Sequence, residues 1–135
     1  MTIREKEAQM IEELNLLPDA QERLSYVVEL GEARPALPHE QRVEAYRVQG
    51  CQSAVWVVPQ SEGQRFATDA DSTIVKGLAW LLCDLYSTGS AVEAATHVSE
   101  LLTATRLDSQ LSPNRRRGLG LVMNRLRALA QAQAE

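Results

Sequence analysis

The sequence has few residues that could build a metal centre or a disulfide framework. Its 135 residues include two cysteines and two histidines. His39 and His97 stand at no metal-ligand spacing from each other or from a cysteine, whereas a structural zinc site requires a denser set of ligands. A C-x-x-C redox pair, a glycine-rich phosphate loop and a serine nucleophile elbow are also missing. We therefore expect no metal site and none of these kinds of catalytic site.

The sequence also lacks an excess of positive charge and a long apolar run. Acidic residues outnumber basic ones by 18 to 14, which gives a net charge of −4. Because no basic field favours nucleic acid or an anionic membrane, a protein or a small molecule is the expected partner. The apolar stretches at 54–58 and 74–85 are too short or too interrupted to span a membrane, and residues 1–6 lack the apolar core of a signal peptide. The expected location is the cytoplasm.

The length fits one domain over residues 1–135, with no internal repeat. Helical periodicity marks both ends of the chain and the segment that ends at Tyr86, while strand-like segments gather at 43–48, 54–58 and 64–68, the last two joined by a turn at 59–63. Short consecutive strands form an antiparallel meander more readily than a parallel sheet. We therefore expect an α+β fold, with a short three-stranded antiparallel sheet packed against several helices.

Capping residues mark where the helices should begin. The first helix is expected over residues 3–17, because Pro18 ends it, and the second should end at Gly31. The expected capping residues are, in chain order, Thr2 with Glu5, Asp19, Asp71, Ser90 with Glu93, and Ser112 with Pro113.

The two cysteines lie in unlike surroundings. Cys83 falls within the apolar helical run 78–85, where a free cysteine behaves as a small buried hydrophobe. Cys51 follows Gly50 and precedes Gln52 and Ser53, a composition typical of a loop, directly before a strand-like segment. This contrast argues against a disulfide and makes Cys51 the candidate for chemistry. A buried structural cysteine is the alternative, and the polar flanks count against it.

A chemical role for Cys51 requires a nucleophilic thiolate. Its neighbours in the sequence are neutral, and Arg47 is four residues away, so nothing adjacent lowers the thiol pKa in an obvious manner. Elsewhere, three arginines at 115–117 fall in the first turn of the last helix, where the helix dipole disfavours positive charge. This cluster is either functional or simply solvated. Asp71 is explained by helix capping alone.

Four stretches of the chain resemble the SufE family of sulfur acceptors. The main one, Gly50-Cys51-Gln52-Ser53-x-Val55-Trp56, is similar to the family's cysteine signature. The other three follow the same order as in the family: Tyr26-Val27-Val28-Glu29-Leu30-Gly31, Asp69-Ala70-Asp71-Ser72-Thr73-Ile74-Val75-Lys76-Gly77-Leu78 and Leu111-Ser112-Pro113-Asn114-Arg115. Together they cover most of the chain.

The resemblance implies a specific role and a fold similar to that of iron-sulfur scaffold proteins. Cys51 would accept persulfide sulfur from a SufS-like cysteine desulfurase, stimulate that enzyme, and pass sulfur to a cluster scaffold. The pyridoxal phosphate would belong to the desulfurase, so this chain would bind no cofactor and would not turn over by itself. The resemblance further implies that Arg115 engages the desulfurase and that Asp71 controls the cysteine loop, which Gly50, Gln52 and Ser53 support.

Other functions remain open from the sequence. The loop could dock a desulfurase or another sulfur-trafficking enzyme without covalent chemistry, as a regulatory module. Cys51 could also be a peroxide-sensing thiol, which requires a low thiol pKa. Cluster assembly on this chain alone is disfavoured, because one accessible cysteine cannot replace several cluster ligands. Gln52 and Ser53 favour the SUF branch of the family over its paralogous branch, and a homodimer is left open.

Overall fold

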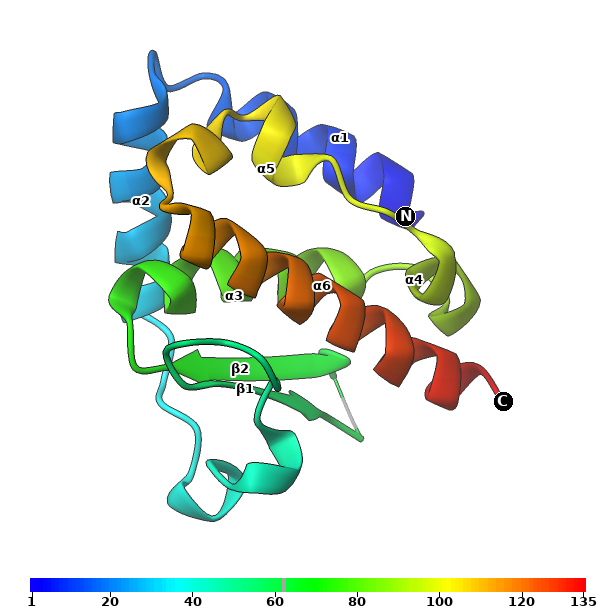
Figure 1. Cartoon of the computed structure of the whole chain (residues 1–135). Helices are drawn as coiled ribbons and strands as arrows, with labels where there is room; N and C mark the ends of the chain where they lie inside the picture. The colour runs from blue at the N-terminus through cyan, green and yellow to red at the C-terminus, as the bar shows by residue number, and fades with distance from the viewer. Residues whose placement is uncertain (62) are drawn as a thin grey trace.

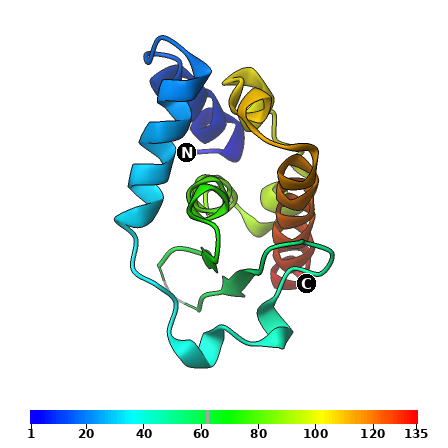
Figure 2. The same cartoon turned by 60° about the vertical axis from the view of Figure 1, so that its left-hand side comes forward.

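A buried helix, α3 (Thr73–Tyr86), forms the centre of the molecule (Figure 1). The computed structural model describes residues 1–61 and 63–135. Figure 2 looks nearly along α3 and shows α2 (Ala20–Glu32) and α6 (Pro113–Ala134) on opposite sides of it, with α1 (Ile3–Leu14) above and the sheet below. Ten of the fourteen α3 residues are buried. The α+β fold is therefore confirmed, with a small antiparallel sheet packed against helices.

The described sheet has two strands, β1 (Val55–Pro59) and β2 (Phe66–Ala70), which pair in antiparallel register from Val55 with Ala70 to Pro59 with Phe66. The third strand expected at 43–48 is wrong. Its residues 44–46 form the 3₁₀ turn η2 (Glu44–Tyr46), and in the described residues an isolated bridge joins Arg47 to Trp56. Because three residues curl into a turn, too few remain extended to build a ladder. The expected turn at 59–63 includes Glu62, which lies outside the described residues.

Most of the predicted helix caps are confirmed, because a cap depends on residues three positions apart. The capping boxes Thr2 with Glu5 and Ser90 with Glu93 are both present, and Ser112 caps α6 with Pro113 in its first turn. Asp19 caps α2 as expected. The first helix is shorter than expected and ends at Leu14, after which residues 15–17 form a turn.

The predicted cap of α3 is wrong by one residue. Ser72 is the N-cap, and its side chain accepts a hydrogen bond from the backbone of Val75 at 3.3 Å. Asp71 is still tied to the sheet, because its backbone N–H donates to the carbonyl of Ala54 at 3.0 Å. The side-chain bond of Ser72 therefore identifies the cap, and the first helical residue is Thr73.

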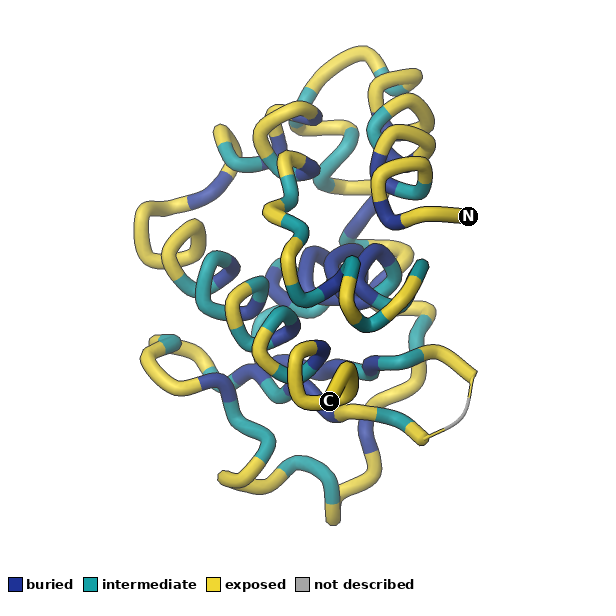
Figure 3. The backbone as a smooth tube through the Cα atoms, turned by 90° about the vertical axis from the view of Figure 1, so that its right-hand side faces the viewer, coloured by how far each residue is buried: buried dark blue, intermediate teal, exposed yellow. Residues whose placement is uncertain are grey.

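The remaining elements are short helical pieces between the longer elements. The short piece η1 (His39–Gln41) lies between α2 and η2, whereas α4 (Ala91–Thr96), α5 (Leu101–Ala104) and η3 (Leu107–Gln110) connect α3 to α6. Figure 3 shows that burial concentrates on α3 and on the inner faces of its neighbours. In α6 the buried positions are Leu119, Val122, Leu126 and Ala130. No helix in residues 1–61 and 63–135 combines the length and apolar character needed to cross a bilayer.

Candidate functional site

Cys51 lies on the connection between η2 and β1, and this connection is folded against the first turns of α6. Its thiol is half-buried and not part of a disulfide. The Sγ atom donates a hydrogen bond to the carbonyl oxygen of Gly118 at 3.6 Å. The thiol thus points toward a helix in this resting state, although the residues around it form no regular element.

Two further contacts hold the loop on each side of Cys51. Arg117 donates from Nη1 to the carbonyl oxygen of Gly50 at 3.0 Å, and Asn114 donates from Nδ2 to Oε1 of Gln52 at 2.9 Å. Gly50 has a φ angle of +90°, a conformation that residues with a side chain rarely adopt. The loop is therefore fixed by a backbone turn at Gly50 and by side chains of α6.

A pocket of about 200 Å³ opens beside the thiol. The predicted site residues Gln52, Ser53 and Arg115 line it together with Cys51. Its other lining residues are Val55, Val75, Ser112, Asn114 and Gly118. The structure thus brings the cysteine loop and the start of α6 to one cavity that has both polar and apolar lining residues.

Electrostatics favour the neutral thiol in this position. Burial raises the pKa of Cys51, and the positive charges of Arg117 and Arg47 oppose the shift without cancelling it. A neutral thiol can donate to the Gly118 carbonyl, whereas a thiolate cannot. A raised thiol pKa is the opposite of what a peroxide-sensing cysteine requires.

Asp71 is not among the described residues that line this pocket. Its side chain is exposed, and Oδ1 accepts a hydrogen bond from Arg42 at 3.3 Å. The guanidinium of Arg42 also lies over the ring of Trp56, 4.6 Å from its centroid. Asp71 therefore bonds the cysteine loop at its exit, through the backbone bond to Ala54.

Cys83 is fully buried in α3, as expected. Burial, followed by the negative charge of Asp84, raises its thiol pKa. A thiol that is both inaccessible and held in its protonated form has no nucleophilic role in the folded chain.

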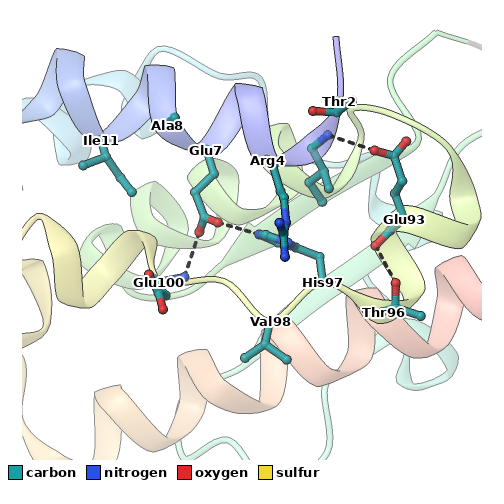
Figure 4. Close-up of a pocket in the computed structure, with 11 residues that line it drawn as sticks. Thr2, Arg4, Glu7, Ala8, Ile11, Glu93, Thr96, His97, Val98 and Glu100 are labelled. Carbon is teal, nitrogen blue, oxygen red and sulfur yellow. Dashed lines mark hydrogen bonds and ion pairs between the residues drawn. The ribbon is translucent and has the colours of Figure 1, made fainter.

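A larger cavity, about 790 Å³, lies between α1 and α4 (Figure 4). Within it, the buried carboxylate of Glu7 contacts the ring of His97 and accepts hydrogen bonds from the hydroxyl of Ser99 and the backbone of Glu100. These bonds satisfy the Glu7 carboxylate and fasten α1 to the segment after α4. Across residues 1–61 and 63–135, no group of three or more His, Cys, Asp or Glu side chains is placed to hold a metal ion.

Sequence reasoning did not single out Asn114 or Gly118, and it considered Arg117 only as one of three clustered arginines, of which the family resemblance favoured Arg115. The spacing of residues 114, 117 and 118 places them on one face of the predicted last helix, which is a further signal that the sequence offers. That signal does not say which loop the face meets. The contact between Arg117 and Gly50 joins residues 67 positions apart.

Comparison with known proteins identifies the family. Residues 8–130 match the family model SufE, described as an Fe-S metabolism associated domain. An uncharacterized SufE-like protein of Rhizobium etli is 35% identical over 133 residues, which cover 93% of this chain and 90% of that protein. An uncharacterized SufE-like protein of Rhizobium meliloti is 29% identical over 133 residues, which cover 93% and 94% of the two chains. The chain therefore belongs to the SufE family, whose domain is associated with iron-sulfur metabolism.

Proposed function

We propose that this chain is a sulfur-transfer protein, which accepts a persulfide sulfur on Cys51 from a SufS-like cysteine desulfurase and relays it toward an iron-sulfur scaffold. The observation that carries the proposal is the half-buried, unpaired thiol on an irregular loop beside a small pocket, in a chain of the SufE family. Such a thiol can move to meet a partner without disturbing a helix or a strand.

The transfer step is a thiol–disulfide-type exchange. The Cys51 thiolate attacks the outer sulfur of a persulfide on the desulfurase cysteine. A bond forms between Cys51 Sγ and the outer sulfur, while the bond between that sulfur and the desulfurase cysteine breaks. The desulfurase cysteine leaves as a thiolate, and the outer sulfur keeps its proton as it moves to Cys51. The reaction moves one sulfur and needs no external oxidant or reductant.

The pocket beside Cys51 suits the next stage. A water molecule occupies about 30 Å³ in the liquid, so the pocket of about 200 Å³ has room for one added sulfur atom. Folding the loop back would place this sulfur among the residues that line the pocket, away from reductants in solution. Cys51 would thus receive the sulfur while the loop is open and hold it in the pocket while the loop is closed.

Activation of the thiol is the partner's task in this scheme. Burial raises the pKa of Cys51 in the resting loop, so the thiol becomes more acidic only after it leaves α6. The chain would therefore do no chemistry alone and would bind no cofactor. Pyridoxal phosphate would be bound by the desulfurase, where it would assist cleavage of the carbon–sulfur bond of cysteine.

Intact mass measured under non-reducing conditions tests the proposal. After incubation with a cysteine desulfurase and cysteine, the wild-type chain should gain the mass of one sulfur. The Cys51→Ser variant should gain none, while Cys83→Ala, which removes the buried thiol, should load like the wild type. Absence of added sulfur on the wild type, or equal loading of Cys51→Ser, would refute the transfer role. If Cys51→Ser still stimulates the desulfurase fully, the loop acts as a non-covalent regulatory module instead.

A further inference from the structure

The three consecutive arginines at the start of α6 point to three different surroundings. Arg115 lines the pocket beside Cys51. Arg116 borders another pocket together with Leu102 and Asp108. Arg117 reaches the cysteine loop itself and donates to the carbonyl oxygen of Gly50. Because successive helical residues are rotated by about 100°, neighbouring arginines with the same charge can serve different purposes.

The loop rests on one face of α6, formed by residues 114, 117, 118 and 121. Asn114 holds Gln52, Arg117 holds Gly50, and the carbonyl of Gly118 accepts from the Cys51 thiol. A methyl group of Leu121 lies 3.1 Å from the position that a Cβ atom on Gly50 would take. The face therefore contacts three consecutive loop residues, of which Cys51 is the middle one.

Arg117 makes the one described contact of this face in which a full positive charge bonds the loop. Its acceptor is a neutral carbonyl, which offers a single oxygen. A carboxylate offers two oxygens and a negative charge, and it binds a guanidinium more strongly. Arg117 is exposed, and no described carboxylate of this chain pairs with it. A carboxylate on a partner could therefore take the guanidinium from Gly50 without unfolding any element.

We propose that Arg117 is a positioning residue that holds the Cys51 loop closed on α6, and that an acidic side chain of the desulfurase releases the loop by competing with Gly50 for the guanidinium. The identity of the partner rests on the proposed function, whereas the closed loop rests on the geometry alone. Partner docking and exposure of the thiol thus become one event, because the same guanidinium serves both.

The first experiment measures how fast iodoacetamide alkylates Cys51 in the free chain as a function of pH. Opening the loop removes burial, which is the larger influence on the pKa of Cys51, together with the smaller influence of Arg117. Arg117→Gln should therefore raise the plateau rate severalfold and move the midpoint to lower pH. If Arg117 acts only through its charge, the same variant moves the midpoint to higher pH, and the proposal is overturned. Arg117→Lys should fall between the two.

Arg116→Gln is the matched control, because it removes the same charge from the adjacent position and leaves the Gly50 contact intact. It should alkylate like the wild type at every pH. Hydrogen exchange of the backbone at residues 49–53 gives a second measurement, which should quicken in Arg117→Gln and not in Arg116→Gln. Equal exchange in these two variants contradicts a loop held by Arg117.

The second experiment measures binding to a cysteine desulfurase by titration calorimetry at low and high salt. Arg117→Glu should weaken binding severalfold more than Arg117→Gln, and the difference should shrink at high salt because ionic screening weakens charge repulsion. Arg116→Glu should have the smaller effect. If Arg117→Glu binds as tightly as the wild type, the desulfurase has no carboxylate that competes for Arg117, and this part of the proposal is refuted. Sulfur loading is scored separately, so a chain that opens as expected but accepts no sulfur refutes only the proposed function.

Discussion

Gly31 of α2 and Gly77 of α3 meet so closely that neither has room for a side chain. A Cβ atom on Gly31 would lie 2.6 Å from the Cα of Gly77, and one on Gly77 would lie 2.7 Å from the carbonyl oxygen of Val27. Both close contacts are with backbone, which cannot turn aside. The two glycines come from two of the stretches that resemble the SufE family, so this part of the resemblance reflects helix packing.

Gly77→Ala should lower the free energy of unfolding by about 1 to 3 kcal/mol, as overpacking of a filled core does. The expected readout is a lower midpoint of urea denaturation. Gly120→Ala is the matched control in α6, because nothing lies within 4 Å of its added Cβ. Alanine favours a helix over glycine, so this control should raise the unfolding free energy by about 0.5 to 1 kcal/mol. A Gly77→Ala variant as stable as the wild type contradicts the packing described.

The start of α3 supplies a second prediction. Ser72→Ala removes the side chain that accepts from Val75, and it should cost about 1 kcal/mol of unfolding free energy, the usual effect of losing an N-cap. Asp71→Ala removes only an exposed ion pair with Arg42, which is worth from about 0 to 1 kcal/mol. Thermal denaturation of the two variants side by side decides which residue caps the helix. A larger loss in Asp71→Ala would restore Asp71 as the cap.

These helix starts show what could be predicted from the sequence. The caps at Thr2, Asp19, Ser90 and Ser112 were predictable because each depends on atoms within the same turn. Asp71 and Ser72 are both suitable caps by residue type, but the Ser72 side chain bonds Val75 whereas the Asp71 carboxylate bonds Arg42, which lies 29 positions earlier in the chain. The strand expected at 43–48 failed for a similar reason, since a strand exists only where a neighbour pairs with it along its length.

The candidate site divides in the same way. The loop character of residues 50–53 follows from their composition, and the structure places Cys51 there with Gly50 at positive φ. The roles of Arg117 and Asn114 could not be predicted, because they depend on which face of α6 meets a loop more than sixty residues earlier in the chain. Among three adjacent arginines, the sequence offers no means of choosing the one that contacts Gly50.

A third prediction concerns stability at alkaline pH. Burial raises the pKa of Tyr86 to about 12 from an ordinary value of 10.0, and it also raises the pKa of Cys83 above its ordinary value of 9.0. Both groups bind their protons more tightly in the folded chain. Their stabilising effect is therefore complete below about pH 9 and declines as the pH rises toward 12. Urea midpoints measured from neutral pH to about pH 11 should fall steadily above pH 9.

Tyr86→Phe separates the tyrosine from the cysteine in this decline. The variant loses the hydrogen bond from the Tyr86 hydroxyl to the carbonyl of His97, at 2.6 Å, so it should be less stable at neutral pH by about 1 kcal/mol. Its stability should then fall less steeply at alkaline pH, because one titrating group is gone. A slope unchanged from the wild type would show that Tyr86 does not contribute.

The last prediction uses the space between α6 and the thiol. A Cβ atom on Gly118 would lie 3.6 Å from Sγ of Cys51, an ordinary contact, and no other described atom from outside its own stretch of α6 comes within 4 Å of it. Gly118→Ala should therefore leave the loop closed and, since alanine suits a helix, raise the unfolding free energy by about 0.5 to 1 kcal/mol. Gly118→Leu extends further toward the sulfur and should push the loop outward, with faster alkylation of Cys51 than in Gly118→Ala.

Both Gly118 variants keep the carbonyl that accepts from the thiol and the guanidinium that bonds Gly50. Faster alkylation in Gly118→Leu alone thus identifies the room beside Gly118 as the place where the closed loop keeps its sulfur, whereas equal rates in both variants would mean that the thiol rests elsewhere.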